Sequence, residues 1–122
     1  ALVEVLASPS LFFADMAGSV MPIAVSHGEG RVAFRDPTHA GEAQATLRYV
    51  DHRGAPTEIY PRNPSGSPGG LTGFTTADGR FSILMPHPER VFRAAQLSWK
   101  PDGMNGAAPW LRMFRNARRA VG

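Results

Sequence analysis

The sequence contains no cysteine. This absence excludes disulfide bonds, thiolate metal sites and a thiol nucleophile within the chain. No apolar run approaches the roughly 18 residues that a membrane-spanning helix needs, and we expect no membrane partner. The N-terminus has neither an initiating methionine nor the basic and apolar regions of a signal peptide. Its first residues have the pattern of a strand entered partway, so we expect the chain to be a piece of a longer protein.

Lysine is almost absent, because Lys100 is the one lysine among 13 basic residues and the others are arginine. Against 10 acidic residues this gives a formal charge of +3, and the arginines are scattered except in the last predicted helix. Such a distribution is typical of a soluble surface, and we predict no nucleic-acid partner. With 122 residues and 43% apolar content, the chain suffices for one small domain with a hydrophobic core.

Alternating apolar residues and turn chemistry predict a chain made mainly of strands before its last quarter. The Asp78-Gly79 dipeptide is the strongest hairpin signal, because it supplies the positive φ of a tight turn. Proline and glycine make up six of the ten residues 61–70, which predicts an irregular loop. The predicted strands cover residues 2–6, 21–26, 31–35, 46–50, 57–60, 71–76 and 80–85. One helical turn is predicted over residues 11–16, and a short helix or loop over residues 36–44.

The last quarter of the chain is predicted to be helical. Residues 91–99 are predicted as a helix, and residues 100–108 as a glycine-rich connection. The final helix is predicted to start at Pro109, because proline is favoured at the first helical position. Spacings of three and four place its apolar residues on one stripe, typical of a helix docked on a sheet. The stripe consists of Trp110, Met113, Phe114, Ala117 and Val121.

His87 and Glu89 form the sharpest group of chemically active side chains. Pro88 disfavours helical angles at His87, and residues i and i+2 of an extended segment point to the same side. We therefore expect the imidazole and the carboxylate to lie side by side just after a strand. A carboxylate in that place fixes the imidazole tautomer and raises its basicity, as a catalytic triad requires. An ordinary surface pair explains the same spacing, so the local pattern leaves both interpretations open.

Other catalytic patterns are missing or unspecific. His27 and Glu29 make a second His-x-Glu pair between glycines, but nothing in the spacing of the two pairs specifies a metal, and we predict none. The sequence has no Gly-x-Ser-x-Gly nucleophile elbow of a serine hydrolase. The glycines of residues 66–70 are not followed by the lysine of a phosphate-binding loop.

The hexapeptide Met-Pro-His-Pro-Glu-Arg, residues 85–90, resembles the segment of class I glutamine amidotransferases that supplies the catalytic histidine and glutamate. Four further segments are similar to the phosphoribosylformylglycinamidine synthase family, in its large single-chain form with a C-terminal glutaminase domain. They are residues 21–31, 47–51, 63–68 and 109–118. Their order is also that of the family, and the resemblance covers nearly the whole chain.

The resemblance implies an α/β fold for residues 1–122, the C-terminal part of a flavodoxin-like class I amidotransferase domain, with a central sheet, a hairpin and a C-terminal helix. The N-terminal half of that domain, with the nucleophilic cysteine, would lie outside the chain. The whole enzyme would be a cytoplasmic, ATP-dependent, glutamine-hydrolysing C–N ligase of purine biosynthesis. In that family, ammonia from glutamine passes to a synthetase site, where ATP and magnesium activate formylglycinamide ribonucleotide for conversion to formylglycinamidine ribonucleotide. No cofactor is expected in this chain itself.

The resemblance also implies roles for individual residues. A cysteine thiolate attacks the glutamine carboxamide and forms a glutamyl thioester. His87 matches the general base and acid of this step, and Glu89 matches the group that orients the imidazole. Five residues are expected to lie near the bound glutamine: Asn63, Ser65, Gly66, Ser67 and His27. Ser65 stands where the family usually has asparagine, which shortens the polar side chain.

Three expectations follow for the isolated chain. It should have no glutaminase activity, because a base without its nucleophile has nothing to activate. It should expose an apolar sheet edge and face, and therefore associate with itself or with the absent half of the domain. Its partners should be glutamine, the rest of the glutaminase domain and the synthetase domain. The alternative is a non-catalytic binding or interaction domain on the same scaffold, which would use the arginines of the last helix.

Overall fold

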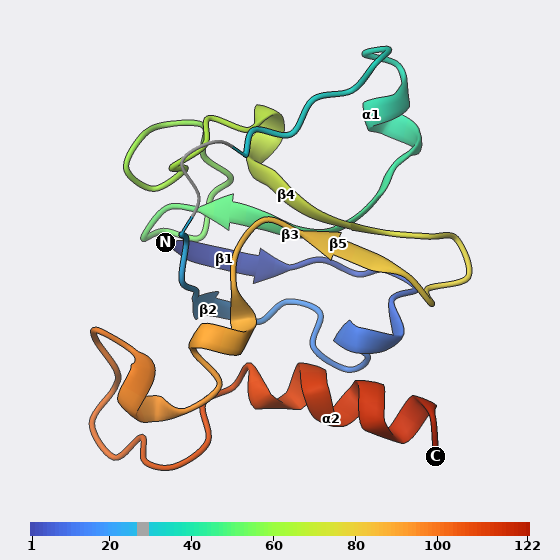
Figure 1. The fold of residues 1–122 in the computed structure, drawn as a ribbon. Coiled ribbons are helices and arrows are strands. Elements are labelled where there is room, and N and C mark those ends of the chain that lie inside the picture. The colour runs from blue at the N-terminus through green and yellow to red at the C-terminus, as the bar shows by residue number, and fades with distance from the viewer. Residues whose placement is uncertain (27–29) are drawn as a thin grey trace.

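The computed structural model of the protein describes residues 1–26 and 30–122 (Figure 1). Within these residues, one five-stranded sheet has the order β2-β1-β3-β4-β5, and every neighbouring pair is antiparallel. The strands are β1 (Leu2–Val5), β2 (Val20–Pro22), β3 (Gln44–Val50), β4 (Leu71–Thr75) and β5 (Ser82–Leu84). The α-helices are α1 (His39–Glu42) and α2 (Leu111–Ala120). Single 3-10 turns cover Leu11–Phe13, Pro68–Gly70, Pro88–Arg90 and Ala94–Gln96.

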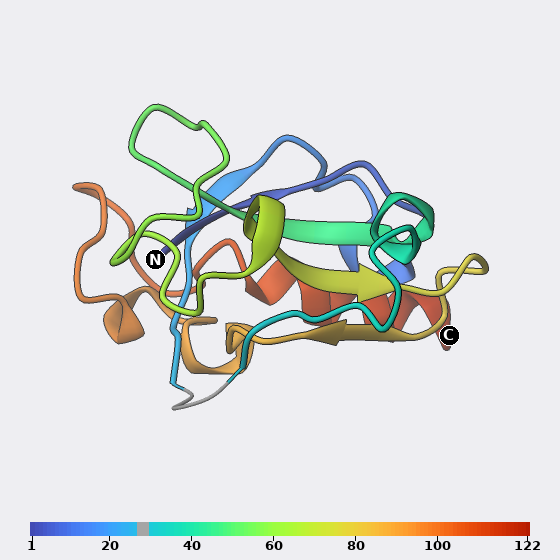
Figure 2. The same ribbon diagram turned by 90° about the horizontal axis from the view of Figure 1, so that it is seen from above.

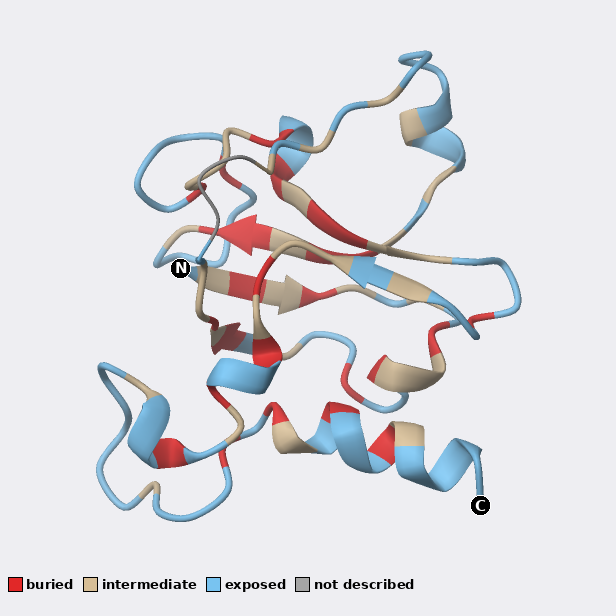
Figure 3. Cartoon of the chain, in the orientation of Figure 1, coloured by how far each residue is buried: buried red, intermediate tan, exposed pale blue. Residues whose placement is uncertain are grey.

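The core lies between one face of the sheet and α2. Val3 and Val5 alternate with partly exposed residues along β1 and are completely buried, which is the expected period of a strand with one buried face. Trp110, which directly precedes α2, and Met113 of α2 belong to the same apolar cluster. Figure 2 shows α2 lying along the sheet, and Figure 3 shows buried residues in the strands and on parts of the helix, whose other residues are intermediate or exposed.

The hairpin between β4 and β5 is fastened to the start of the chain. Gly79 has a φ of 71°, and a Cβ atom built there would lie 1.8 Å from the carbonyl oxygen of Pro9. The backbone N–H of Leu11 donates to Gly79 O at 3.0 Å, and the hydroxyls of Ser10 and Ser82 are 2.9 Å apart. Glycine is required at this turn both for its φ and for the close approach of the two segments.

Much of the predicted element order is confirmed. The mixed α/β class is confirmed, with a central sheet, a hairpin at Asp78-Gly79 and a C-terminal helix. The strand predicted over residues 2–6 corresponds to β1, and the strand predicted over residues 46–50 lies within β3. The helical turn, the short helix and the irregular loop over residues 61–70 also occur where they were expected.

Two predicted strands are wrong. Residues 57–60 follow β3 but form no strand, because only Thr57 N–H bonds to β3, donating to Tyr49 O at 3.1 Å, before the chain turns at Ile59, whose carbonyl oxygen accepts from Asn63 N–H at 3.0 Å. Pro56 makes only an isolated bridge to Val50. Residues 31–35 are also irregular, since Phe34 packs edge-on against the ring of Phe74, with ring centroids 5.7 Å apart. Their apolar character is used in side-chain packing rather than in a strand ladder.

The predicted helix over residues 91–99 is wrong as well, apart from the turn Ala94–Gln96. Its backbone bonds to another segment: Ala94 N–H donates to Gly106 O, and Ala108 N–H donates to Phe92 O, both at 2.8 Å. These bonds replace the intrahelical ones that a helix would need.

The apolar stripe of the last helix is only partly right. Trp110 and Met113 are buried, whereas Phe114 is 40% and Val121 is 80% exposed. Asn116 is buried in place of an apolar residue. Among the described residues, no helix is long and apolar enough to cross a membrane.

Candidate active site

His87 lies three residues after the end of β5 and is fixed by its backbone. Its N–H donates to the carbonyl oxygen of Ala24 at 2.8 Å, which forms an isolated antiparallel bridge between two distant segments. The predicted strand over residues 21–26 is therefore interrupted: β2 ends at Pro22, and Ala24 turns to pair with His87. His87 has φ −114° and ψ 83°, outside the helical region, as expected for a residue before proline.

Glu89 reaches the imidazole from the next turn of the chain. Its Oε1 atom lies 2.7 Å from Nδ1 of His87, so the predicted juxtaposition of the two side chains is confirmed. The local conformation differs from the expected one, because Pro88–Arg90 forms a 3-10 turn instead of continuing extended. This turn, closed by the bond from Val91 N–H to Pro88 O at 3.1 Å, brings the carboxylate back to the ring.

The electrostatics of the pair favour an ionised carboxylate. Partial burial acts to raise the pKa of Glu89, but the hydrogen bond with His87, backed by the backbone N–H of Glu89 and by the nearby positive charges, holds this pKa below its ordinary value. An ionised Glu89 can only accept, so Nδ1 of His87 is the donor of the pair. In the neutral imidazole with this tautomer, the other ring nitrogen, Nε2, carries a lone pair and can take a proton.

A hollow of about 380 Å³ adjoins the pair. Leu84 of β5 and Met113 and Phe114 of α2 give it an apolar wall opposite the polar side chains. The imidazole is partly open to solvent, with 29% of its side-chain surface exposed. The hollow thus combines a base, a carboxylate and apolar side chains, which is the composition expected of a small-molecule site.

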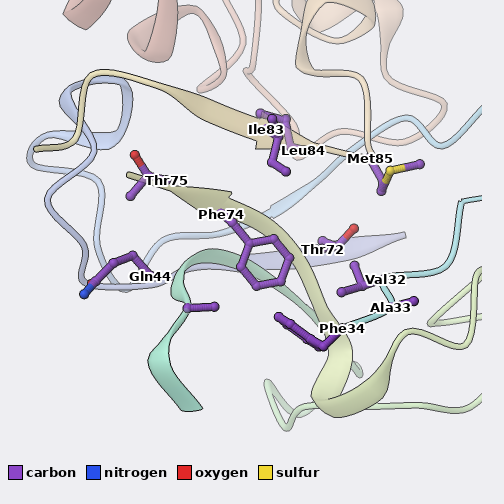
Figure 4. Close-up of a pocket in the computed structure, with 11 residues that line it drawn as sticks. Val32, Ala33, Phe34, Gln44, Thr72, Phe74, Thr75, Ile83, Leu84 and Met85 are labelled. Atoms are coloured by element: carbon purple, nitrogen blue, oxygen red, sulfur yellow. The ribbon is translucent and has the colours of Figure 1, made fainter. Parts of the chain in front are cut away.

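A second hollow, of about 370 Å³, lies beside β4 and β5 (Figure 4). Its lining includes the aromatic pair Phe34 and Phe74 together with Ile83, and no titratable side chain of the described residues is part of it. The hollow beside His87 differs from it in being lined by an imidazole and a carboxylate.

The loop over residues 61–70 is organised by Asn63, which is 1% exposed. Its Nδ2 atom donates to Thr57 O at 3.0 Å and to Ser67 O at 2.9 Å. Its Oδ1 atom accepts from Ser67 N–H at 3.2 Å and from the Ser65 hydroxyl at 3.3 Å. The polar atoms of Asn63 are engaged within the loop, so this side chain shapes the backbone rather than offering free donors to a ligand.

The other residues assigned to the glutamine vicinity surround Asn63. The Ser65 and Ser67 hydroxyls are 2.8 Å apart, and Ser67 Oγ accepts from Val32 N–H at 3.1 Å. Gly66 takes a positive φ of 66° at the apex. His27 lies outside the described residues, as does Glu29.

The loop and the His87–Glu89 pair lie at the same end of the sheet. The loop leads directly into β4, and β5 runs antiparallel to β4 before leading to His87. The bond from Met85 N–H to Thr72 O, 3.0 Å long, extends this pairing beyond the end of β5. No hydrogen bond joins the loop to the pair within the described residues.

Sequence reasoning missed the contact that anchors the segment before Ala24. The indole Nε1 of Trp110 donates to Pro22 O at 2.7 Å, and Trp110 is 1% exposed. A buried tryptophan N–H usually requires an acceptor, so a Trp on the apolar stripe was a signal that such a contact exists. Among the described residues, no group of three or more His, Asp or Glu side chains is placed to hold a metal ion.

The family model of the CobB/CobQ-like glutamine amidotransferase domain matches residues 1–121. The chain belongs to this family. Among solved structures, this amidotransferase chain is similar to one described as the structure of PurLQS from Thermotoga maritima, with 23% identity and a TM-score of 0.66. The match covers 99% of this chain and 46% of that one. At this identity the likeness establishes a shared fold, and the chain spans less than half the length of the protein it matches.

Proposed function

We propose that this amidotransferase chain supplies the base and its orienting carboxylate to the glutaminase site of a phosphoribosylformylglycinamidine synthase. The observation that carries the proposal is the 2.7 Å contact between His87 Nδ1 and Glu89 Oε1, in a chain that belongs to the glutamine amidotransferase family. The likeness in fold to PurLQS favours this enzyme among the family's members. Residues 1–122 are then the C-terminal portion of the glutaminase domain, and the nucleophile comes from the portion before it.

Each side chain of the pair has one task in the proposed mechanism. His87 Nε2 takes the proton of a cysteine thiol, and the thiolate attacks the carboxamide carbon of glutamine. As the C–N bond breaks, His87 returns the proton to the leaving nitrogen, so ammonia departs and a glutamyl thioester remains. Water, deprotonated by the same nitrogen, then hydrolyses the thioester to glutamate and restores the thiol. Glu89 stays ionised throughout and holds the Nδ1–H tautomer, because its pKa lies below the ordinary carboxyl value.

The loop built by Asn63 is proposed to face the glutamine. Because the side chain of Asn63 is engaged in the loop, its role is to hold the backbone of Ser65, Gly66 and Ser67 in place. The short Ser65 side chain is likewise engaged by its neighbours. Contacts to glutamine from this loop would therefore come from backbone groups. His27, which lies outside the described residues, is assigned to the same vicinity by resemblance alone.

The ligase chemistry is assigned to another part of the whole protein. Ammonia would pass to a synthetase domain, where ATP and magnesium support the conversion of formylglycinamide ribonucleotide in the cytoplasm. Neither ATP nor magnesium is assigned to this chain in the proposal. The isolated chain should hydrolyse no glutamine, because it contains no cysteine.

The test compares two nitrogen sources in the full-length protein. The variant His87→Ala should lose glutamine-dependent formation of formylglycinamidine ribonucleotide, by about 10³-fold or more, and retain the ammonia-dependent reaction. Retention excludes a general loss of folding, since the synthetase site still works. Full glutamine-dependent activity in the variant would refute the proposal and favour a non-catalytic binding domain on this scaffold.

A further inference from the structure

Three segments that are far apart in the sequence meet behind His87. They are residues 20–24, which include β2, residues 86–94, which include the His87–Glu89 pair, and residues 106–110, which lead into α2. The first contact is the bond from His87 N–H to Ala24 O at 2.8 Å. It joins the residue proposed as the base to the segment that follows β2.

The second contact joins the His87 segment to the residues before α2. Ala94 N–H donates to Gly106 O, and Ala108 N–H donates to Phe92 O, both at 2.8 Å. Arg93 and Ala107 form an antiparallel bridge between these bonds. The chain that follows Glu89 is therefore held to residues 106–108 by a short two-stranded ladder.

The third contact is made by a side chain, and it completes a closed ring of contacts among the three segments. Trp110 Nε1 donates to Pro22 O at 2.7 Å, two residues before the carbonyl that accepts from His87. The indole N–H can only donate a hydrogen bond, and the Trp110 side chain is almost wholly buried. Among the described residues, this is the hydrogen bond that joins residues 20–24 directly to residues 106–110, beside the apolar packing of Met21 and Ile23 in the same core cluster as Trp110.

We propose that Trp110 is a positioning residue for His87. Glu89 lies on the same turn as His87 and fixes only the rotation of the imidazole. The turn is tied to the sheet on one side by the bond from Met85 N–H to Thr72 O and on the other by the bond from His87 N–H to Ala24 O. The segment that carries Ala24 is held by β1, through its pairing with β2 and the bond from Ile23 N–H to Ala1 O, and by Trp110. The direction of Nε2 toward a nucleophile thus depends in part on a side chain outside the His87–Glu89 pair. The catalytic consequence rests on the proposed glutaminase function, whereas the mechanical link does not.

The same helix offers a matched control. Asn116 is also buried, and its Nδ2 atom donates to Phe12 O at 3.0 Å and to Ala14 O at 2.9 Å. It fastens α2 to the turn Leu11–Phe13, away from the ring of three segments. Asn116→Ala therefore removes side-chain bonds from the same helix to backbone carbonyls, without touching Pro22.

The first experiment uses this chain and does not depend on catalysis. Amide hydrogen exchange of His87 is measured by NMR in Trp110→Phe and in Asn116→Ala, relative to the amides of β1 and β3. The proposal predicts that Trp110→Phe accelerates exchange at His87 by about tenfold or more beyond any change in the sheet, and that Asn116→Ala does not. The proposal would be overturned if the two variants changed the exchange rate of His87, relative to the amides of β1 and β3, by the same factor. It would also be overturned if Trp110→Phe did not change this relative rate. If Trp110→Phe does not fold, benzothienylalanine at position 110 keeps the two-ring shape without the N–H.

The second experiment measures glutamine hydrolysis by the full-length protein. Trp110→Phe should lower kcat by about tenfold to a hundredfold, the effect of a small misplacement of a catalytic group, with KM for glutamine unchanged. Asn116→Ala should leave kcat near that of the unmodified protein. A kcat unchanged in Trp110→Phe would overturn the positioning role. If the unmodified protein hydrolyses no glutamine, the proposed function fails, and the exchange experiment still decides the mechanical link.

Discussion

Gly79 offers the clearest stability test of the fold, because its two constraints can be separated. Its φ of 71° lies in the left-handed region, which costs a residue with a Cβ about 1–2 kcal/mol. In addition, a Cβ atom at this position would lie 1.8 Å from Pro9 O, so the turn must move away. That movement breaks the hydrogen bond from Leu11 N–H to Gly79 O and the hydrogen bond between the Ser10 and Ser82 hydroxyls. Each is worth about 1 kcal/mol net.

The variant Gly79→Ala should therefore lower the free energy of unfolding by about 3–4 kcal/mol, a large part of the roughly 5–15 kcal/mol typical of a domain. The assay is denaturant unfolding followed by circular dichroism, with linear extrapolation to water. Gly54→Ala is the matched control: Gly54 has φ 81°, but a Cβ atom added there would have no neighbour within 4 Å, so this variant should cost only about 1–2 kcal/mol. Equal losses in the two variants would refute the claim that the hairpin is packed against Pro9.

Three further predictions concern the loop, the catalytic pair and the sheet edge. Asn63→Ala should lower the free energy of unfolding by about 2–4 kcal/mol, because it leaves buried loop groups unpaired; a loss no larger than that of the exposed Asn105→Ala would contradict this. Glu89 has a lowered pKa in the folded chain, so its pairing stabilises the fold fully above the ordinary carboxyl pKa, and this contribution is lost as pH falls through the lowered value. The stability difference between the unmodified chain and Glu89→Gln should shrink over that range, and a pH-independent difference would count against the pair. Ile83 is 72% exposed on the edge strand β5, so Ile83→Lys should reduce self-association in light scattering; a chain that is already monomeric would rule out the association itself.

The sequence predicted best the elements whose signals are local. The Asp78-Gly79 turn and the alternation in β1 depend on residues close together in the chain, and both were found. The last helix was also found, although it begins at Leu111, two residues after the predicted Pro109. Residues 57–60 carry an acceptable local strand pattern, but Ile59 O accepts from Asn63 N–H and the chain turns away from β3. Residues 91–99 have helical spacing, yet their backbone bonds to residues 106–108. These failures come from backbone bonds to other segments, which single-sequence patterns do not encode.

The candidate site shows the same division. The contact between His87 and Glu89 was predictable, because both residues lie on one short segment, although the 3-10 turn that creates it was not. The anchoring of His87 by Ala24, and of that segment by Trp110, involves partners more than 60 residues apart. The hydrogen bonds of Asn63 to its own loop could not be predicted from the sequence either, since its side chain has the same hydrogen-bonding groups whether it binds a ligand or the backbone.

We propose His87, held by Glu89, as the base of a glutaminase site. The most direct measurement is the rate of glutamine hydrolysis by the full-length protein and by its His87→Ala variant, with His52→Ala as a control at an exposed histidine. The account predicts a loss of about 10³-fold or more for His87→Ala and full activity for His52→Ala. Glutamine hydrolysis at the unmodified rate in His87→Ala would contradict it.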